Sequence, residues 1–361
     1  MCDAALDLKA IEGWLRESDS RRLNELWAWA DCVRRRHVGD EIHLRGLVEI
    51  SNFCVRSCAY CGIRAPNMRL TRYRMSEDEI LECARMAVKR RCGTIVLQSG
   101  EDYGMEARWV ARVIRRIREE TPLAVTLSLG ERSVRDLAAW REAGADRYLL
   151  RFETSDGELY RLIHPPVRGE RSDRIAQLRE IRRLGYETGS GVMVGIPGQT
   201  FASLARDIEL FSVLDLDMIG VGPYIPHPDT PLGAGQICPY CVPQEQVPRD
   251  DVTACKVVAL ARLVRPDANI PSTTALATVN PTHGRLLGLQ RGANVVMPNL
   301  TPARYRALYE IYPGKAVVSE TAGAMPEESE NPFACIGRTV GVGPGGRRKG
   351  VACVATRLVQ D

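Results

Sequence analysis

The chain has 361 residues, and 45% of them are hydrophobic, which is enough for a large buried core. A net charge of +4 is too small to indicate nucleic-acid binding, and no basic run is interleaved with aromatic residues. No apolar stretch approaches the ~20 residues of a membrane helix, and the acidic, amphipathic first residues differ from a secretion signal. Twelve cysteines without such a signal indicate a reducing, cytoplasmic location, where clustered cysteines bind metals or perform chemistry.

Apolar strands alternate with amphipathic helices along most of the chain, after a helical region at about residues 6–36. The predicted strands are residues 43–51, 94–100, 124–130, 146–153, 188–195, 217–225, 268–276 and 294–299. The predicted helices that follow them are residues 76–91, 107–120, 133–144, 174–185, 201–214, 252–265, 282–292 and 301–312. Such alternation predicts parallel strands joined by crossover helices. Eight units favour a complete (β/α)8 barrel of the TIM type over an open, doubly wound sheet.

Two segments fall outside this repeat, and they set the expected organisation. We expect an N-terminal helical region at residues 1–41, the barrel at residues 42–315 and a C-terminal extension at residues 316–361. A Pro- and Gly-rich insertion at residues 233–250 interrupts the barrel between its sixth strand and the next helix. The extension is rich in Gly, Glu and Arg, so we expect it to pack poorly.

Three cysteines follow the first predicted strand, at the end of a barrel where active sites lie. Cys54, Cys58 and Cys61 have the spacing C-x3-C-x2-C. A zinc site is the structural alternative, but structural zinc is normally closed by four ligands, usually as two separated pairs. No fourth Cys or His follows nearby. A [4Fe–4S] cluster normally takes four thiolates. Three cysteines therefore predict a cluster with one iron left for a substrate or cofactor.

The triplet, with Tyr60 directly before its last cysteine, resembles the signature of the radical S-adenosylmethionine (SAM) superfamily. The resemblance implies a [4Fe–4S] cluster whose open iron is chelated by the amino and carboxylate groups of SAM. It also implies that the reduced cluster cleaves SAM to a 5′-deoxyadenosyl radical. The stretch "QSGED" resembles a superfamily motif whose backbone meets the SAM amino group; its candidate residues are Ser99, Gly100 and Glu101. The stretch "GSGVMVGIPGQT" resembles a Gly-rich motif against which the adenosine packs; its candidate residues are Gly191 and Gly195.

Charged residues after the fourth strand fit the same interpretation. Arg151 and Glu153 lie two positions apart, so alternation puts their side chains on one face of the strand. Together with Arg174, which opens the next predicted helix, they could hold a zwitterionic amino acid: guanidinium for carboxylate, carboxylate for ammonium. A purely structural Arg–Glu pair is the alternative.

A closer resemblance, over about residues 44–315, is to the HydE family of [FeFe]-hydrogenase maturases. It is carried by stretches such as "LRGLVEISNFCVRSCAYCGIR" and "LGYETGSGVMVGIPGQT". The resemblance implies that the adenosyl radical acts on a cysteine-bound Fe(CO)2(CN) synthon, toward the di-iron subcluster. It implies a small organometallic or amino-acid-like substrate and other maturation proteins as partners, with no nucleic acid and no membrane. The implied substrate-binding residues are Arg45, Thr273, Thr274, Met297, Tyr309 and Tyr312; core packing is the alternative for the Met and both Tyr.

The chain departs from this family in its remaining cysteines. Many members carry a second cluster on a C-terminal cysteine triad, but here that region has only Cys335 and Cys353. We therefore expect no second cluster of that type. The insertion contains a CxxC pair, Cys238 and Cys241, which is a weak signal for a metal site. His164 has no matching ligands in the sequence and is interpreted as an ordinary loop or core histidine.

Two other functions are consistent with the sequence. One is a radical SAM amino-acid mutase of the methylornithine synthase type, which would act on an amino acid without iron. The other is a non-catalytic metal-binding scaffold in an assembly complex. Iron content and SAM cleavage would separate the scaffold from an enzyme.

Overall fold

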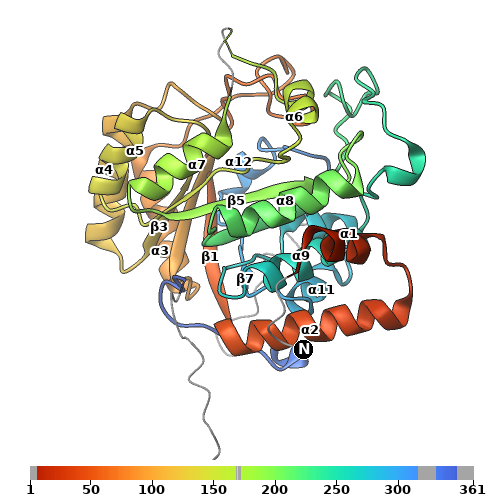
Figure 1. Cartoon of the computed structure of the whole chain (residues 1–361). Helices are drawn as coiled ribbons and strands as arrows, with labels where there is room; N and C mark the ends of the chain where they lie inside the picture. The colour runs from red at the N-terminus through yellow and green to blue at the C-terminus, as the bar shows by residue number, and fades with distance from the viewer. Residues whose placement is uncertain (1–5, 168, 170–171, 316–330, 348–361) are drawn as a thin grey trace, which may run out of the picture.

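The computed structural model describes residues 6–167, 169, 172–315 and 331–347. Its central feature is a curved parallel sheet with the strand order β6-β5-β4-β3-β2-β1-β7 (Figure 1). The α/β fold is thus built on a partial barrel. The bounds of these strands are β1 (Glu41–Ser51), β2 (Thr94–Ser99), β3 (Ala124–Ser128), β4 (Arg147–Leu149), β5 (Glu187–Val194), β6 (Met218–Pro223) and β7 (Val295–Val296).

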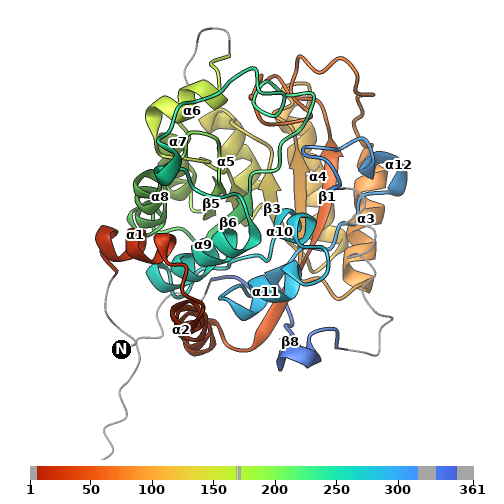
Figure 2. The same cartoon turned by 90° about the vertical axis from the view of Figure 1, so that its right-hand side faces the viewer.

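Helices between the strands cover the outside of the sheet (Figures 1 and 2). Their apolar faces explain this position: the buried side of α4 is Val110, Ala111, Val113, Ile114 and Ile117, and its other face is rich in Arg. The helices between β1 and β6 are α3 (Glu77–Lys89), α4 (Ala107–Glu120), α5 (Val134–Glu142), α6 (Gly157–Ile163), α7 (Arg174–Arg183) and α8 (Phe201–Val213). After β6 come η1 (Pro243–Glu245), α9 (Asp251–Val264), α10 (Thr274–Val279), α11 (Gly284–Gln290) and α12 (Ala303–Arg306).

The expected strand at residues 268–276 is not a regular strand. Isolated parallel bridges join Asn269 to Met218 of β6 and Pro271 to Val295 of β7. Proline has no N–H to donate to a strand ladder, and Thr273 caps α10 by accepting a hydrogen bond from the Leu276 N–H. Local capping and proline therefore replace the strand that apolar periodicity predicted. The predicted helix at residues 301–312 is likewise reduced to the short α12.

The N-terminal region forms two helices, α1 (Leu8–Arg16) and α2 (Ser20–Val38), which pack on the outer helices α8 and α9. Asp7 and Asp19 cap them by accepting hydrogen bonds from backbone N–H groups three residues later. In both views α2 lies below the sheet, at the end where the strands begin. Among the described residues, no helix is long and apolar enough to cross a membrane.

The C-terminal extension is held by a few specific contacts where the structure describes it, although most of its described residues are exposed or half-buried. After η2 (Ala334–Ile336), β8 (Thr339–Val340) pairs with the first residues of β1. The Arg347 guanidinium forms ion pairs with Asp215, Asp217 and Asp267, at 2.7–2.8 Å. Charge pairing thus holds the Gly-rich tail at the amino end of the sheet (Figure 2). Residues 316–330 and 348–361, including Cys353, lie outside the described residues.

Candidate active site

The three predicted cluster cysteines lie in one loop directly after β1, at the carboxyl end of the sheet. Neighbouring elements fix this loop through its backbone: the Val55 N–H donates to the Glu101 carbonyl (2.9 Å) and the Ala59 N–H to the Ile163 carbonyl (2.8 Å). The Gly62 N–H donates to the Ile311 carbonyl (3.0 Å). Segments after β2, at the end of α6 and after α12 therefore position the thiols together.

The donor set is of the type that an iron–sulfur cluster uses, with three thiols on one loop. Burial raises the pKa of Cys54, Cys58 and Cys61, that of Cys61 to about 12. In a cluster each thiolate binds its own iron. The Glu101 N–H also donates to the Cys54 sulfur (3.4 Å), a contact that suits a cluster ligand.

Gly100 brings the end of β2 into contact with the cysteine loop. A Cβ atom at this position would lie 2.8 Å from the Cβ of Cys54. Ser99 precedes it as the last residue of β2, and its hydroxyl donates to the Gly100 carbonyl (2.5 Å). Glycine is needed here because any side chain would displace the loop that carries the first thiol.

Behind the loop, four charged side chains form a buried network. Arg56 lies between Glu101 (2.7 Å) and Glu131 (2.8 Å). Glu131 also accepts from Nε of Arg174 (3.0 Å). The Glu101 carboxylate further accepts from the Tyr103 hydroxyl (2.9 Å), so both the side chain and the backbone of Glu101 hold the loop. Sequence reasoning missed Arg56 and Glu131, although Glu131 follows β3 and could have been found by examining charges after every strand.

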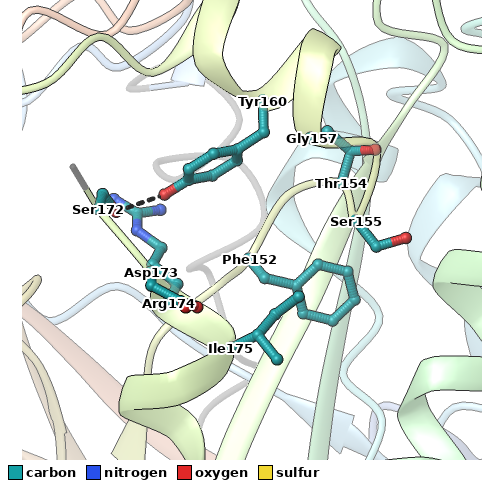
Figure 3. Close-up of a pocket in the computed structure, with 9 residues that line it drawn as sticks. All are labelled: Phe152, Thr154, Ser155, Gly157, Tyr160, Ser172, Asp173, Arg174 and Ile175. Atoms are coloured by element: carbon teal, nitrogen blue, oxygen red, sulfur yellow. Dashed lines mark hydrogen bonds between the residues drawn. The ribbon is translucent and has the colours of Figure 1, made fainter.

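Arg174 is the first residue of α7, and its guanidinium reaches toward the cysteine loop. Besides Glu131, it donates to the Arg151 carbonyl (2.7 Å) and contacts Nε2 of His164 (2.6 Å). A cavity of about 160 Å³ lies beside it, lined also by Phe152, Tyr160 and Ser172. Figure 3 shows the Tyr160 hydroxyl turned toward Ser172, close to the Arg174 guanidinium.

Arg151 and Glu153 lie together as predicted, but β4 ends at Leu149, so the turn after the strand brings them together and not strand alternation. Nη2 of Arg151 is 3.1 Å from Oε2 of Glu153, and Glu153 is buried. Glu153 has φ of +65°, a left-handed conformation that is rare for residues other than glycine. Strain of this kind persists where the surroundings impose it, and it is concentrated at functional sites. Nε of Arg151 has no hydrogen-bond partner among the described residues, so it could donate to a ligand.

The glycines of β5 are required by packing within the chain. A Cβ on Gly191 would lie 1.9 Å from the Gly220 carbonyl oxygen of β6, and one on Gly195 would lie 2.5 Å from the Cα of Arg249. Gly195 also has φ of +79°. These contacts explain both glycines without a bound adenosine. Tyr60 packs on an apolar cluster that includes Met193 of β5, which brings it toward the same strand end.

Two of the predicted substrate residues, Tyr309 and Tyr312, lie near Glu49 of β1. Tyr309 is buried, and its ring lies 5.0 Å from Nζ of Lys315, which forms an ion pair with the buried Glu49 of β1. Sequence reasoning missed this pair. The pKa of Tyr312 is raised by burial. Thr273 and Thr274 begin α10, and Met297 directly follows β7. The Thr273 hydroxyl donates to the Val221 carbonyl (2.8 Å) and accepts from the Leu276 N–H as the cap of α10. It therefore has a structural role besides its predicted role as a ligand.

Arg45 is not brought to this end. It lies near the start of β1, paired in register with Thr94, the first residue of β2. Its Nη2 donates to the Gly345 carbonyl of the tail (3.1 Å), and burial lowers its pKa to about 9. Strand position explains the difference: Arg45 precedes the end of β1 by six residues, and a parallel strand advances ~3.3 Å per residue. We therefore leave Arg45 out of the site.

The cysteines of the insertion and the tail differ in exposure. Cys238 is exposed and Cys241 half-buried, and their thiols face different carbonyls, those of Gly235 and Val242. Cys335 is exposed in η2, in the tail.

Comparison with known proteins identifies the chain. Residues 48–211 match the model of the radical SAM superfamily. Over 332 residues, which cover 92% of this chain and 91% of the relative, the sequence is 45% identical to the [FeFe] hydrogenase maturase subunit HydE of Thermotoga maritima. This chain belongs to the HydE family of the radical SAM superfamily. The family resemblance predicted from the cysteine loop is thus confirmed, and the chain is a radical SAM enzyme.

More distant relatives share the fold. The 3-methylornithine synthase of Methanosarcina barkeri is 27% identical over 307 residues, which cover 81% of this chain and 82% of that protein. A crystal structure of methylornithine synthase superposes with a TM-score of 0.70 at 24% identity, and covers 81% of this chain and 82% of that one. Membership in the HydE family therefore rests on sequence identity, and the structural likeness supports the α/β fold alone.

Proposed function

We propose that this chain acts in [FeFe]-hydrogenase maturation, on a cysteine-bound Fe(CO)2(CN) synthon that leads to the di-iron subcluster. The observation that carries the proposal is 45% identity over 92% of the chain to a HydE maturase. A cysteine triplet at the carboxyl end of a parallel sheet, beside charged groups that suit an amino acid, supports it.

Cys54, Cys58 and Cys61 would hold a [4Fe–4S] cluster and leave one iron for SAM. The bound cluster supplies the electron that cleaves SAM to a 5′-deoxyadenosyl radical. The chain contributes the shape and polarity of the site. Hydrogen bonds to the loop backbone fix the thiols, and the Glu101 N–H points at the Cys54 sulfur.

The charged groups around the loop would orient SAM. Arg174 suits the carboxylate of its methionine part, and Glu153 suits the ammonium group, because oppositely charged groups in a buried site bind strongly and directionally. Arg151 lies between them, with its carbonyl bonded to Arg174 and its guanidinium beside Glu153. Ser99, Gly100 and Glu101 would face the amino group through their backbone. Adenosine would pack along the backbone at the end of β5, beside Gly191 and Gly195, whose close packing on Gly220 and Arg249 fixes this strand end.

The substrate would lie deeper in the sheet, between the cysteine loop and β7. We infer that residues 269–271 complete an eight-membered barrel around this space, since they bridge β6 and β7. Thr273, Thr274 and Tyr312 offer hydroxyl groups, while Met297 and Tyr309 offer an apolar lining. Such a lining excludes water from a radical. Other maturation proteins would deliver or receive the small organometallic compound.

To test this, the purified protein is reconstituted anaerobically and added to a hydrogenase maturation mixture from which HydE has been left out. We expect hydrogenase activity to be restored in a SAM-dependent manner. Turnover of a free amino acid to a rearranged isomer, without restoration, would favour the mutase. Iron binding without SAM cleavage would favour the scaffold.

A further inference from the structure

His164 and Arg174 form a contact that the proposed chemistry does not yet use. His164 ends α6, is 3% exposed, and places Nε2 2.6 Å from Nη2 of Arg174. A guanidinium only donates hydrogen bonds, so Nε2 must be the acceptor, and the proton of the neutral ring is on Nδ1. Nδ1 has no hydrogen-bond partner among the described residues. Burial and the charges of Arg174 and Arg56 lower the pKa of His164 to about 2, which keeps the ring neutral.

The remaining bonds of Arg174 show what this contact leaves available. Of its five N–H donors, one on Nε goes to Glu131, one on Nη1 to the Arg151 carbonyl and one on Nη2 to His164. Two donors remain, one on each terminal nitrogen. A carboxylate accepts such a pair as two parallel bonds.

We propose that His164 is a positioning residue, which fixes the guanidinium of Arg174 so that its two remaining donors face the carboxylate of SAM. The inference rests on the proposed role of Arg174. A neutral acceptor suits this task, because a carboxylate in its place would compete with the ligand for the charge of Arg174. Glu131 competes less, since it is shared with Arg56.

The cavity beside Arg174 explains why such an acceptor is needed. It gives the guanidinium space to adopt other orientations (Figure 3). On its far side, Tyr160 stacks on the His164 ring (4.9 Å between centroids) and bonds through its hydroxyl to Ser172. Ser172 in turn donates to Glu131 (2.6 Å). This stacking also defines the competing interpretation, in which His164 only packs against Tyr160.

Two substitutions separate the hydrogen bond from the packing. His164→Gln keeps an acceptor and loses the ring; His164→Phe keeps a ring against Tyr160 and loses the acceptor. SAM affinity is measured by anaerobic calorimetry on cluster-loaded protein, normalised to iron content. We expect Kd to rise about tenfold or more in H164F and to stay within about threefold of wild type in H164Q, because a bond to a charged group is lost only in H164F. If H164F does not fold, His164→Met replaces it, with the same expectation.

Arg174→Ala is the reference variant. A rise in Kd for H164F and R174A, with H164Q near wild type, supports the inference. Weaker binding in H164Q than in H164F would overturn it in favour of packing, and so would wild-type affinity in both. Wild-type affinity in R174A would instead contradict the proposed role of Arg174, which distinguishes failure of the proposed function from failure of the role of His164.

Discussion

Gly100 lies so close to Phe53 that a Cβ atom on the glycine would be 2.2 Å from the Phe53 carbonyl oxygen. This contact links the end of β2 to the residue before the first cluster cysteine. Gly100→Ala should therefore displace the cysteine loop and lower iron incorporation to less than half of wild type. Iron per chain after anaerobic reconstitution measures this.

Gly13→Ala is the matched control, because a Cβ there would meet nothing within 4 Å. Gly13 lies inside α1, where alanine stabilises a helix by roughly 0.5–1 kcal/mol. G13A should load iron as wild type does. Normal loading in G100A would show that the close contact is not needed for the cluster.

Glu153 should be needed for SAM and dispensable for folding. Its left-handed backbone costs ~1–3 kcal/mol, and Glu153→Gly removes that cost along with the side chain. We expect the Tm of E153G to stay within a few degrees of wild type, while SAM affinity falls at least tenfold. The exposed Glu158→Gln serves as a control with unchanged affinity. A large loss of Tm at unchanged affinity would assign Glu153 a structural role instead.

Asp207 should make the stability of the protein depend on pH. It is fully buried, and burial raises its pKa to about 6. The folded state therefore binds the proton of Asp207 more tightly than the unfolded chain does, because the pKa of an Asp in an unfolded chain is about 4. The stability contributed by this proton is present below about pH 4 and is lost as the pH rises through about 6.

Asp207→Asn keeps an oxygen for the Ser155 N–H and removes the charge. At pH 8 the variant should be more stable than wild type by about 1–3 kcal/mol, since each pKa unit corresponds to ~1.4 kcal/mol. At pH 4 the difference should vanish. Urea unfolding at both pH values, with the exposed Glu119→Gln as control, tests this; a variant that gains stability only at pH 4 would reverse the assigned sign.

The cysteines outside the triplet should be dispensable. Replacing Cys238, Cys241, Cys335 and Cys353 together with Ser should leave iron per chain and SAM cleavage close to wild type. The physical reason is exposure: Cys238 and Cys335 are exposed, on segments outside the repeated strands and helices. A joint loss of iron and SAM cleavage in this variant would show that a second cluster is functional.

The sequence predicted the parts of this protein that follow from periodicity and spacing. Alternating strands and helices from β1 to β6 formed as expected, and the cysteine triplet identified the superfamily because its spacing is rarely accidental. The pairing of Arg151 with Glu153 was also predicted, although it arises in the turn after β4 and not from strand alternation. These features depend on residues close together in the chain.

Features set by distant contacts could not be predicted in this way. Pro271 and the Thr273 cap interrupt an apolar run that looks like a strand. Arg347 fixes a Gly-rich tail whose composition suggests poor packing. Arg45 matched a family position, but only the structure shows that it lies near the amino end of β1, away from the cysteine loop. Its register with Thr94 and its hydrogen bond to the Gly345 carbonyl place it there.

The central claim is that Cys54, Cys58 and Cys61 hold one [4Fe–4S] cluster whose open iron binds SAM. The most direct measurement is electron paramagnetic resonance of the reduced, anaerobically reconstituted protein with and without SAM, together with iron analysis. We expect about four iron atoms per chain and a signal that changes shape when SAM is added, both of them lost in Cys58→Ala. Full iron content in C58A, or a wild-type signal that SAM leaves unchanged, would contradict the account.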